Sequence, residues 1–183
     1  MTVLVLRIMT GKKAEQVLRQ VGFTLIELMV VLSIAAVLMA FALPAFNDFT
    51  QQRRMAASVN LWVSAVGYAR SEATRAGQRV TLQTLNGADA DNEWGPGFCV
   101  TLGDPGQCDE PLRLFLPESN ITLDGIDAYD RVDALGFDGR GLLIGNQAGR
   151  IEVCGEDADA DPGRSIAINA LGRTSVAEQV CYP

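Results

Sequence analysis

The first half of the chain contains two segments whose hydrophobic patterns differ. Residues 23–46 (FTLIELMVVLSIAAVLMAFALPAF) carry one ionisable side chain, Glu27, and are otherwise apolar on every side of a helix. A helix of these 24 residues is about 36 Å long, which is enough to cross the hydrocarbon core of a membrane. The pattern therefore predicts a transmembrane helix over 23–46, with a bend at Pro44 because proline removes a helical hydrogen bond.

The following segment predicts an amphipathic helix that continues the first helix to about Ala76. Apolar residues recur there at steps of three and four, and most of the arginines lie off this stripe. Gly77 is suited to end the helix. The stripe consists of Met55, Val59, Trp62, Val63, Val66, Ala69 and Ala73.

Short strand patterns, punctuated by glycines, fill the remainder of the chain. A helix followed by a run of strands is typical of an α+β fold. We therefore expect a long N-terminal helix, first hydrophobic and then amphipathic, packed on a C-terminal antiparallel β-sheet domain. The expected strands are 79–85, 97–102, 112–116, 121–123, 135–137, 142–144, 150–154, 165–169 and 173–180.

Residues 1–22 carry four basic residues and one acidic residue, which predicts that they stay in the cytoplasm while the C-terminal part crosses the membrane. Met1 and Met9 are both candidate start residues, and a start at Met9 would give a shorter leader. A plain membrane anchor and a signal peptide cut at 40–42 (Ala-Phe-Ala) both fit the apolar segment. Neither explains Glu27, because a carboxylate inside a membrane helix is energetically costly.

A processing motif explains that carboxylate. Residues 22–27 (GFTLIE) resemble the cleavage site of type IV prepilins. The resemblance implies a prepilin peptidase that cuts between Gly22 and Phe23, N-methylation of Phe23, and pairing of Glu27 with an N-terminal amine during filament assembly. A buried carboxylate beside a buried ammonium offsets two desolvation costs and sets the register.

The motif implies three parts of the chain. Residues 1–22 are a leader peptide, 23–46 form the transmembrane and filament-core helix, and 47–183 form a periplasmic or extracellular pilin domain. Removal of the leader would leave 11 arginines and 21 acidic residues, a net charge of −10. The chain has no histidine, which excludes Ser-His-Asp and Cys-His catalysis. We expect a protein that is not an enzyme and uses no cofactor.

All four cysteines lie beyond the membrane segment, at Cys99, Cys108, Cys154 and Cys181. An even number in an exported domain predicts two disulfides. Three connectivities are possible, and we favour the neighbour pairs Cys99–Cys108 and Cys154–Cys181. A zinc site of four thiolates is the alternative, although no two cysteines have the two-to-four-residue spacing typical of such sites. We therefore expect no metal.

Later motifs resemble the GspH/FimT family of minor pilins, in its FimT- or FimU-like form. The family implies a minor subunit of a type IV pilus that primes assembly near the tip. A minor pseudopilin of a type II secretion system is the alternative, since both systems use the same leader and helix. The motifs are residues 68–73 (YARSEA), 94–98 (WGPGF), 136–141 (GFDGRG) and the block that contains Cys154, Gly172, Arg173 and Cys181.

The resemblance also implies partners and a location. The partners are prepilin peptidase, other major and minor pilins, the inner-membrane assembly platform and, before assembly, the inner membrane. The chain would cross the inner membrane once with a cytoplasmic N-terminus. It would then enter a filament on the cell surface or in the periplasm.

Some members of this family bind DNA for uptake through a Gly-Arg-x-Arg motif, which opens a third function. Residues 172–175 (GRTS) keep only the first arginine, Arg173, and Arg150 and Arg164 are candidate neighbours. The net charge of −10 argues against a DNA-binding surface. Two acidic loops are also candidate calcium sites. One contains Asp157, Asp159 and Asp161, and the other contains Asp89, Asp91, Asn92 and Glu93.

Overall fold

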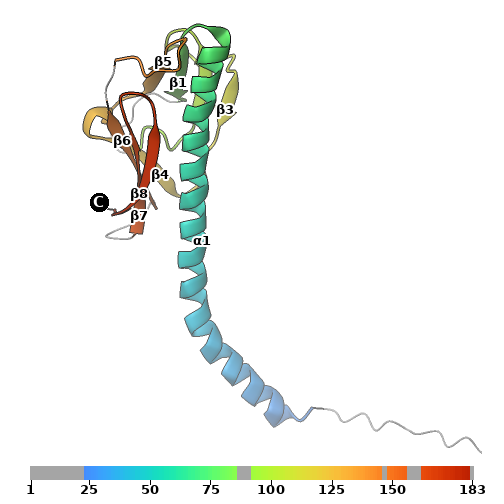
Figure 1. Ribbon diagram of the computed structural model, residues 1–183. Helices are drawn as coiled ribbons and strands as arrows, with labels where there is room; N and C mark the ends of the chain where they lie inside the picture. Colours follow the sequence, from blue (N-terminus) through green and yellow to red (C-terminus); the bar gives the residue numbers. More distant parts are fainter. Residues whose placement is uncertain (1–22, 86–91, 146–147, 156–161, 182–183) are drawn as a thin grey trace, which may run out of the picture. The chain divides into compact units, whose positions relative to one another are not determined.

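A computed structural model describes residues 23–85, 92–145, 148–155 and 162–181, apart from the side chains of residues 44 and 45. In these residues, one long helix precedes eight strands and one 3-10 turn (Figure 1). The predicted order, a helix followed by antiparallel strands, is confirmed. The elements are α1 (Leu25–Ala76), β1 (Val80–Thr84), β2 (Phe98–Leu102), β3 (Arg113–Phe115), β4 (Ile121–Ile126), η1 (Asp127–Tyr129), β5 (Ala134–Phe137), β6 (Gly149–Gly155), β7 (Pro162–Ile168) and β8 (Thr174–Val180).

The residues of helix α1 are divided between two compact units of the chain. The boundary between them falls between Leu43 and Pro44. Pro44 lies inside the helix, and the bend expected at this residue stays a prediction. The helix ends before Gly77, whose φ of 64° is a left-handed conformation that favours glycine at a helix C-terminus.

The second unit holds the buried core, and the apolar stripe of α1 forms one side of that core. Six of the seven stripe residues are buried, and Val63 is half-buried against the same cluster. Trp62 packs edge-on against Trp94, with the ring centroids 5.7 Å apart. The pattern missed Ala65 and Ser58, which are also buried.

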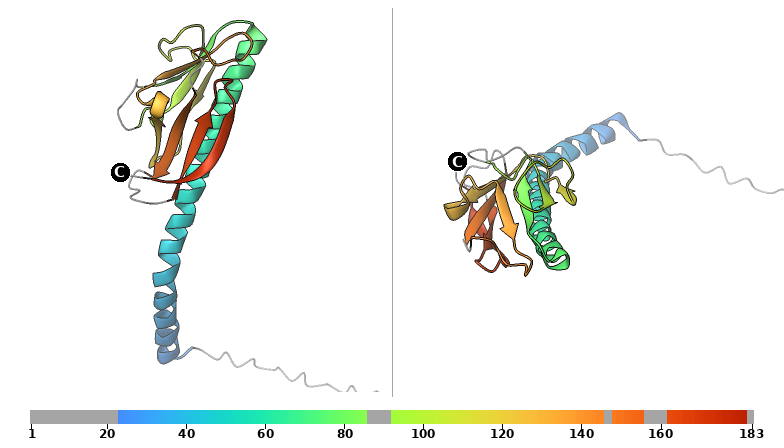
Figure 2. Two further views of the ribbon diagram at one scale, coloured as in Figure 1. Left: turned by 60° about the vertical axis from the view of Figure 1, so that its left-hand side comes forward. Right: turned by 90° about the horizontal axis from the view of Figure 1, so that it is seen from above.

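The strands form two four-stranded antiparallel sheets (Figures 1 and 2). One sheet has the order β3-β2-β1-β5, and the other has the order β4-β6-β7-β8. In the second sheet, Val153, Ile151 and Ile166 share the face that contributes to the core. Residues beside them in sequence, such as Glu152, lie on the opposite face, as the two-residue period of a strand requires.

The strand expected over 142–144 is not a full strand. Only Leu143 forms an isolated bridge, to Phe137. The Asp138 carboxylate accepts hydrogen bonds from the backbone N–H groups of Arg140 and Leu142, each at 2.9 Å, and these bonds organise a turn instead. The Leu142 N–H, together with the Arg140 guanidinium, lowers the pKa of Asp138. Strands β4 and β7 are longer than expected, because β4 continues to Ile126 and β7 begins at Pro162.

Candidate functional site

The first turn of α1 carries the single acidic residue of the apolar segment. Thr24 precedes the helix, and its hydroxyl oxygen accepts a hydrogen bond from the backbone N–H of Glu27 at 3.3 Å. These two residues occupy the positions of a capping box, T-x-x-E. The positive end of the helix dipole also favours a carboxylate at this place. Phe23 is exposed, whereas Gly22 lies outside the described residues, so the cleavage site stays a prediction.

The segment that follows Glu27 is an exposed apolar surface. Within the described residues, α1 is the helix that is long and apolar enough to cross a membrane, and its most apolar window has a mean hydropathy of 2.6. None of that window is buried against the protein. A soluble monomer rarely exposes so large an apolar surface, so lipid or other subunits are expected to cover it. Its large exposed side chains include Leu25, Ile26, Leu28, Met29, Val30, Val31, Leu32, Ile34, Val37, Leu38, Met39, Phe41 and Leu43.

Two disulfides hold loops and a chain end to the sheets. Cys99 of β2 is bonded to Cys108 in the following loop, with the Cα atoms 6.1 Å apart. Cys154 of β6 is bonded to Cys181, just beyond β8, with the Cα atoms 5.9 Å apart. These are the neighbour pairs that the sequence analysis favoured.

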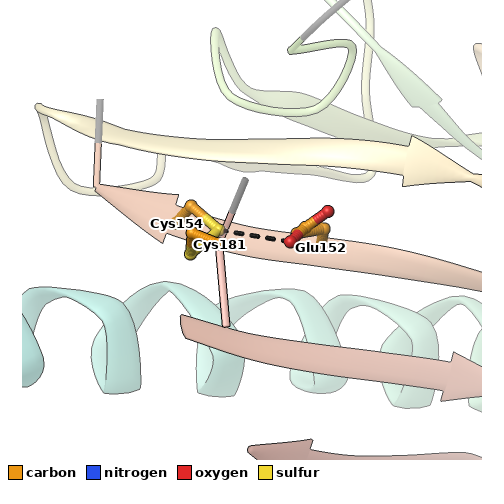
Figure 3. A group of neighbouring side chains, drawn as sticks. All are labelled: Glu152, Cys154 and Cys181. Carbon is orange, nitrogen blue, oxygen red and sulfur yellow. Dashed lines mark hydrogen bonds between the residues drawn. A yellow bond between two sulfur atoms is a disulfide. The ribbon is translucent and has the colours of Figure 1, made fainter. Parts of the chain in front are cut away.

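Glu152, Cys154 and Cys181 lie close together, as Figure 3 shows. A Glu152 carboxylate oxygen is 3.5 Å from the Cys154 sulfur and also accepts a hydrogen bond from the Gln179 side chain. The two sulfurs are bonded to each other, so they are not thiolates that could hold a metal ion. The contacts of Glu152 therefore tie β6 to β8 on the outer face of the sheet.

The acidic loops proposed for calcium fall largely outside the described residues, which exclude Asp89, Asp91, Asp157, Asp159 and Asp161. Of the second loop, Asn92 and Glu93 are described, and both hold β4. The Asn92 side-chain oxygen accepts from the Leu123 N–H at 2.8 Å. The buried Glu93 carboxylate accepts from the N–H groups of Gly125 and Arg131, each at 2.9 Å. These two side chains thus serve the fold.

The structure brings two of the three candidate DNA-contacting arginines together. Arg150 and Arg173 line one open groove, and Arg164 lines another. Arg150 forms an ion pair with Asp127 at 2.7 Å, and Arg164 lies 3.7 Å from Glu178. Neighbouring carboxylates therefore offset two of the three positive charges, and Arg173 remains exposed at the β7–β8 turn.

Arg70 is a structural residue that the hydrophobic pattern did not identify, because it lies off the apolar stripe. Its Nε donates to the Gly141 carbonyl and its Nη1 to the Gly172 carbonyl, each at 3.0 Å. A Cβ at Gly172 would lie 3.1 Å from the Phe137 ring and 3.5 Å from Arg70. The YARSEA and Gly-Arg motifs are therefore parts of one contact between α1 and two turns. The motifs themselves were the signal that could have indicated it.

We expect Arg70→Ala to destabilise the domain by about 2 kcal/mol, because it removes two hydrogen bonds from a charged donor in a partly buried site. Urea unfolding of residues 47–183 measures the loss. Arg75→Ala is the matched control on the same helix, since Arg75 is exposed and contacts only Glu72 among the described ion pairs. Equal stability of the two variants would contradict a stabilising role for the two Arg70 hydrogen bonds.

Two family profiles match this chain. The profile of type II transport protein GspH matches residues 58–172, and the prokaryotic N-terminal methylation motif matches residues 19–43. Type IV major fimbrial protein FimA of Dichelobacter nodosus is 52% identical over 42 residues, which are 23% of this chain and 26% of that protein. A fimbrial protein of the same organism matches to the same extent. The match therefore spans about a quarter of these curated relatives.

Solved structures resemble the larger part of the chain. The crystal structure of type IV minor pilin FimU from Pseudomonas aeruginosa is 26% identical with a TM-score of 0.57, and the match covers 70% of this chain and 92% of that chain. A second crystal form of the same protein gives a TM-score of 0.55, with 67% and 90% covered. The arrangement expected from the sequence, a long helix followed by antiparallel sheets, is the pilin arrangement of FimU.

Proposed function

Because the chain belongs to the family of type II transport protein GspH, we propose that it is a minor pilin that enters a type IV pilus and primes assembly near the filament tip. The observation that carries this proposal is the exposed apolar helix with Glu27 in its first turn, both of which lie within the matched N-terminal methylation motif. The similarity to FimU supports a pilus subunit. Pilins are structural proteins, so we assign no reaction.

In this proposal, prepilin peptidase cuts between Gly22 and Phe23 and N-methylates Phe23. The apolar helix first lies in the inner membrane, with the N-terminus in the cytoplasm and the pilin domain on the other side. The inner-membrane assembly platform then transfers the helix from lipid to the filament core. This transfer exchanges one apolar environment for another, so the exposed side chains of 23–43 remain covered at both stages.

Glu27 has a specific part in this transfer. In the separate subunit, its carboxylate lies at the helix N-terminus, where the dipole stabilises it. In the filament core, we propose that it pairs with the N-terminal amine of a neighbouring pilin. A buried carboxylate without such a partner is costly, so the pair selects one axial register between subunits.

A clean deletion, scored in parallel for surface pili with twitching and for secreted enzymes in the medium, tests the proposal. We expect loss of pili and twitching with intact secretion, and recovery when the gene is restored. Intact pili together with exoproteins trapped in the periplasm would contradict it. That result would identify a minor pseudopilin of a type II secretion system, the second candidate, which the description of the matching family favours.

A further inference from the structure

The free edge of β8 is a surface that the proposed function does not explain. Unpaired strand edges promote unwanted pairing, and proteins usually cover, shorten or charge them. The two sheets have four edges, formed by β3, β5, β4 and β8. Three of these edges are protected in the described part of the chain, and the β8 edge is not.

The edges of β4 and β5 are covered by hydrogen bonds. Along β4, Leu123 exchanges hydrogen bonds with Trp94 and the Asn92 side chain. Along β5, the Gly136 carbonyl accepts from the N–H of Ile144 at 2.8 Å, and Phe137 forms the bridge with Leu143.

The edge of β3 is protected in a different way. This strand has only three residues and carries Arg113, and Pro111 and Pro117 flank it at either end. Short length, charge and proline each limit pairing with another strand.

The edge of β8 lacks short length, proline and hydrogen-bonded cover from described residues, and Glu178 is its one charged residue. The strand is seven residues long (TSVAEQV) and carries no proline or basic residue. The N–H of Asn169 donates to the Arg173 carbonyl at 3.0 Å, which fixes the alternation of the β7–β8 ladder. In that alternation, the backbone groups of Ser175, Ala177 and Gln179 point toward β7. Those of Thr174, Val176, Glu178 and Val180 point outward, and no described residue pairs with them.

The side chains of this edge indicate what it binds. Val176 lies opposite Ile166 on the core-facing side of the sheet, yet Val176 is 46% exposed and Ile166 is fully buried. Val180 is exposed to a similar extent, and the Glu178 side chain between them is 86% exposed. A groove beside this edge is lined by Gln52 of α1 together with the ends of β7 and β8. Next to the unpaired backbone, the sheet therefore offers two exposed valine side chains and the Glu178 carboxylate, which lies 3.7 Å from the Arg164 guanidinium and extends into solvent.

We propose that the β8 edge pairs with an extended segment of a neighbouring pilin subunit, in a β-augmentation contact. The segment would place apolar side chains on Val176 and Val180 and a basic side chain near Glu178. This inference rests on the proposed function, because a filament supplies such neighbours. A second copy fits less well, since antiparallel β8–β8 pairing about a two-fold axis would reverse the direction of α1, which packs along the same core face.

Val176→Pro tests the edge specifically, because it removes an outward N–H and leaves the β7–β8 ladder intact. Ala170→Pro is the matched control because Ala170 is the second position of the β7–β8 turn, where proline is favoured, and the substitution leaves the edge unchanged. Both variants are expressed as full chains, and each is measured in membranes and in sheared filaments. We expect equal amounts of both variants in membranes and normal incorporation of the control into filaments. We expect the incorporation of Val176→Pro to be reduced about tenfold or more relative to the unsubstituted chain.

The outcomes separate this inference from the proposed function. Absence of the unsubstituted chain from filaments would contradict the proposed function. Its presence together with normal incorporation of Val176→Pro would overturn only the edge contact. If Val176→Pro is unstable, Val180→Asp supplies the test. The free subunit tolerates an aspartate at this exposed position, whereas an apolar partner segment would be opposed by its charge. Self-association of residues 47–183 through this edge would assign it to a second copy and would also overturn the proposal.

Discussion

Glu27→Ala is expected to leave processing intact and to abolish normal assembly. The peptidase would still cut after Gly22, so the shorter mature chain would accumulate in the membrane. Incorporation into filaments is expected to fall roughly tenfold or more, because the neighbouring amine would enter the filament core without its carboxylate partner. Immunoblots of membranes and sheared filaments measure both quantities, and the size of the chain reports cleavage.

A second substitution separates the charge of Glu27 from its position in the helix cap. Glu27→Gln keeps a polar side chain at the third position of the capping box, and the N–H of residue 27 can still donate to Thr24. If the charge of Glu27 pairs with an amine, Glu27→Gln is expected to lose incorporation into filaments to the same extent as Glu27→Ala. Normal incorporation of Glu27→Gln would show that capping alone is required, and normal incorporation of both variants would exclude the assembly role.

Removal of the Cys154–Cys181 disulfide is the second large effect. The bond joins two cysteines that are 27 residues apart in sequence. For a loop of this length, the chain-entropy model predicts that removal of the bond lowers the free energy of unfolding by about 3 to 4 kcal/mol. Replacement of both residues by alanine avoids placing hydroxyl groups in a buried site, where Cys181 is almost fully enclosed. Urea unfolding of residues 47–183, under oxidising conditions, measures the change.

The other disulfide provides the control for that measurement. Cys99 and Cys108 are nine residues apart, so the same model predicts a smaller loss of about 2.5 kcal/mol when both are replaced by alanine. The domain contains the whole buried core, which makes it a suitable unit for unfolding. A larger loss at Cys99 and Cys108 than at Cys154 and Cys181 would contradict the entropic explanation.

Two features of this protein could be recognised from local pattern alone. The helical stripe from Met55 to Ala73 was identified because a helix buries one face at a period of 3.6 residues, whatever it packs against. The segment 22–27 was recognised because its chemistry lies in adjacent residues. Both are properties of a short stretch of chain.

Other features depend on residues that are far apart in sequence. Arg70 lies off the stripe, and its role appears only because residues 71 and 102 positions later, Gly141 and Gly172, reach it. Glu93 is part of a polar, acidic stretch in the sequence, yet it is buried and holds β4. No hydrophobic period predicts either contact, since hydrogen bonding rather than apolar burial makes them favourable.

The same distinction applies to the strands. Alternation located most of them, but it could not show that 142–144 is held in a turn by Asp138 or that β8 ends its sheet with an open edge. Apolar and polar periodicity records which face of an element is buried. The order of strands, the partner of each backbone group and the protection of each edge are decided by how distant segments pack, so they are known only from the tertiary structure.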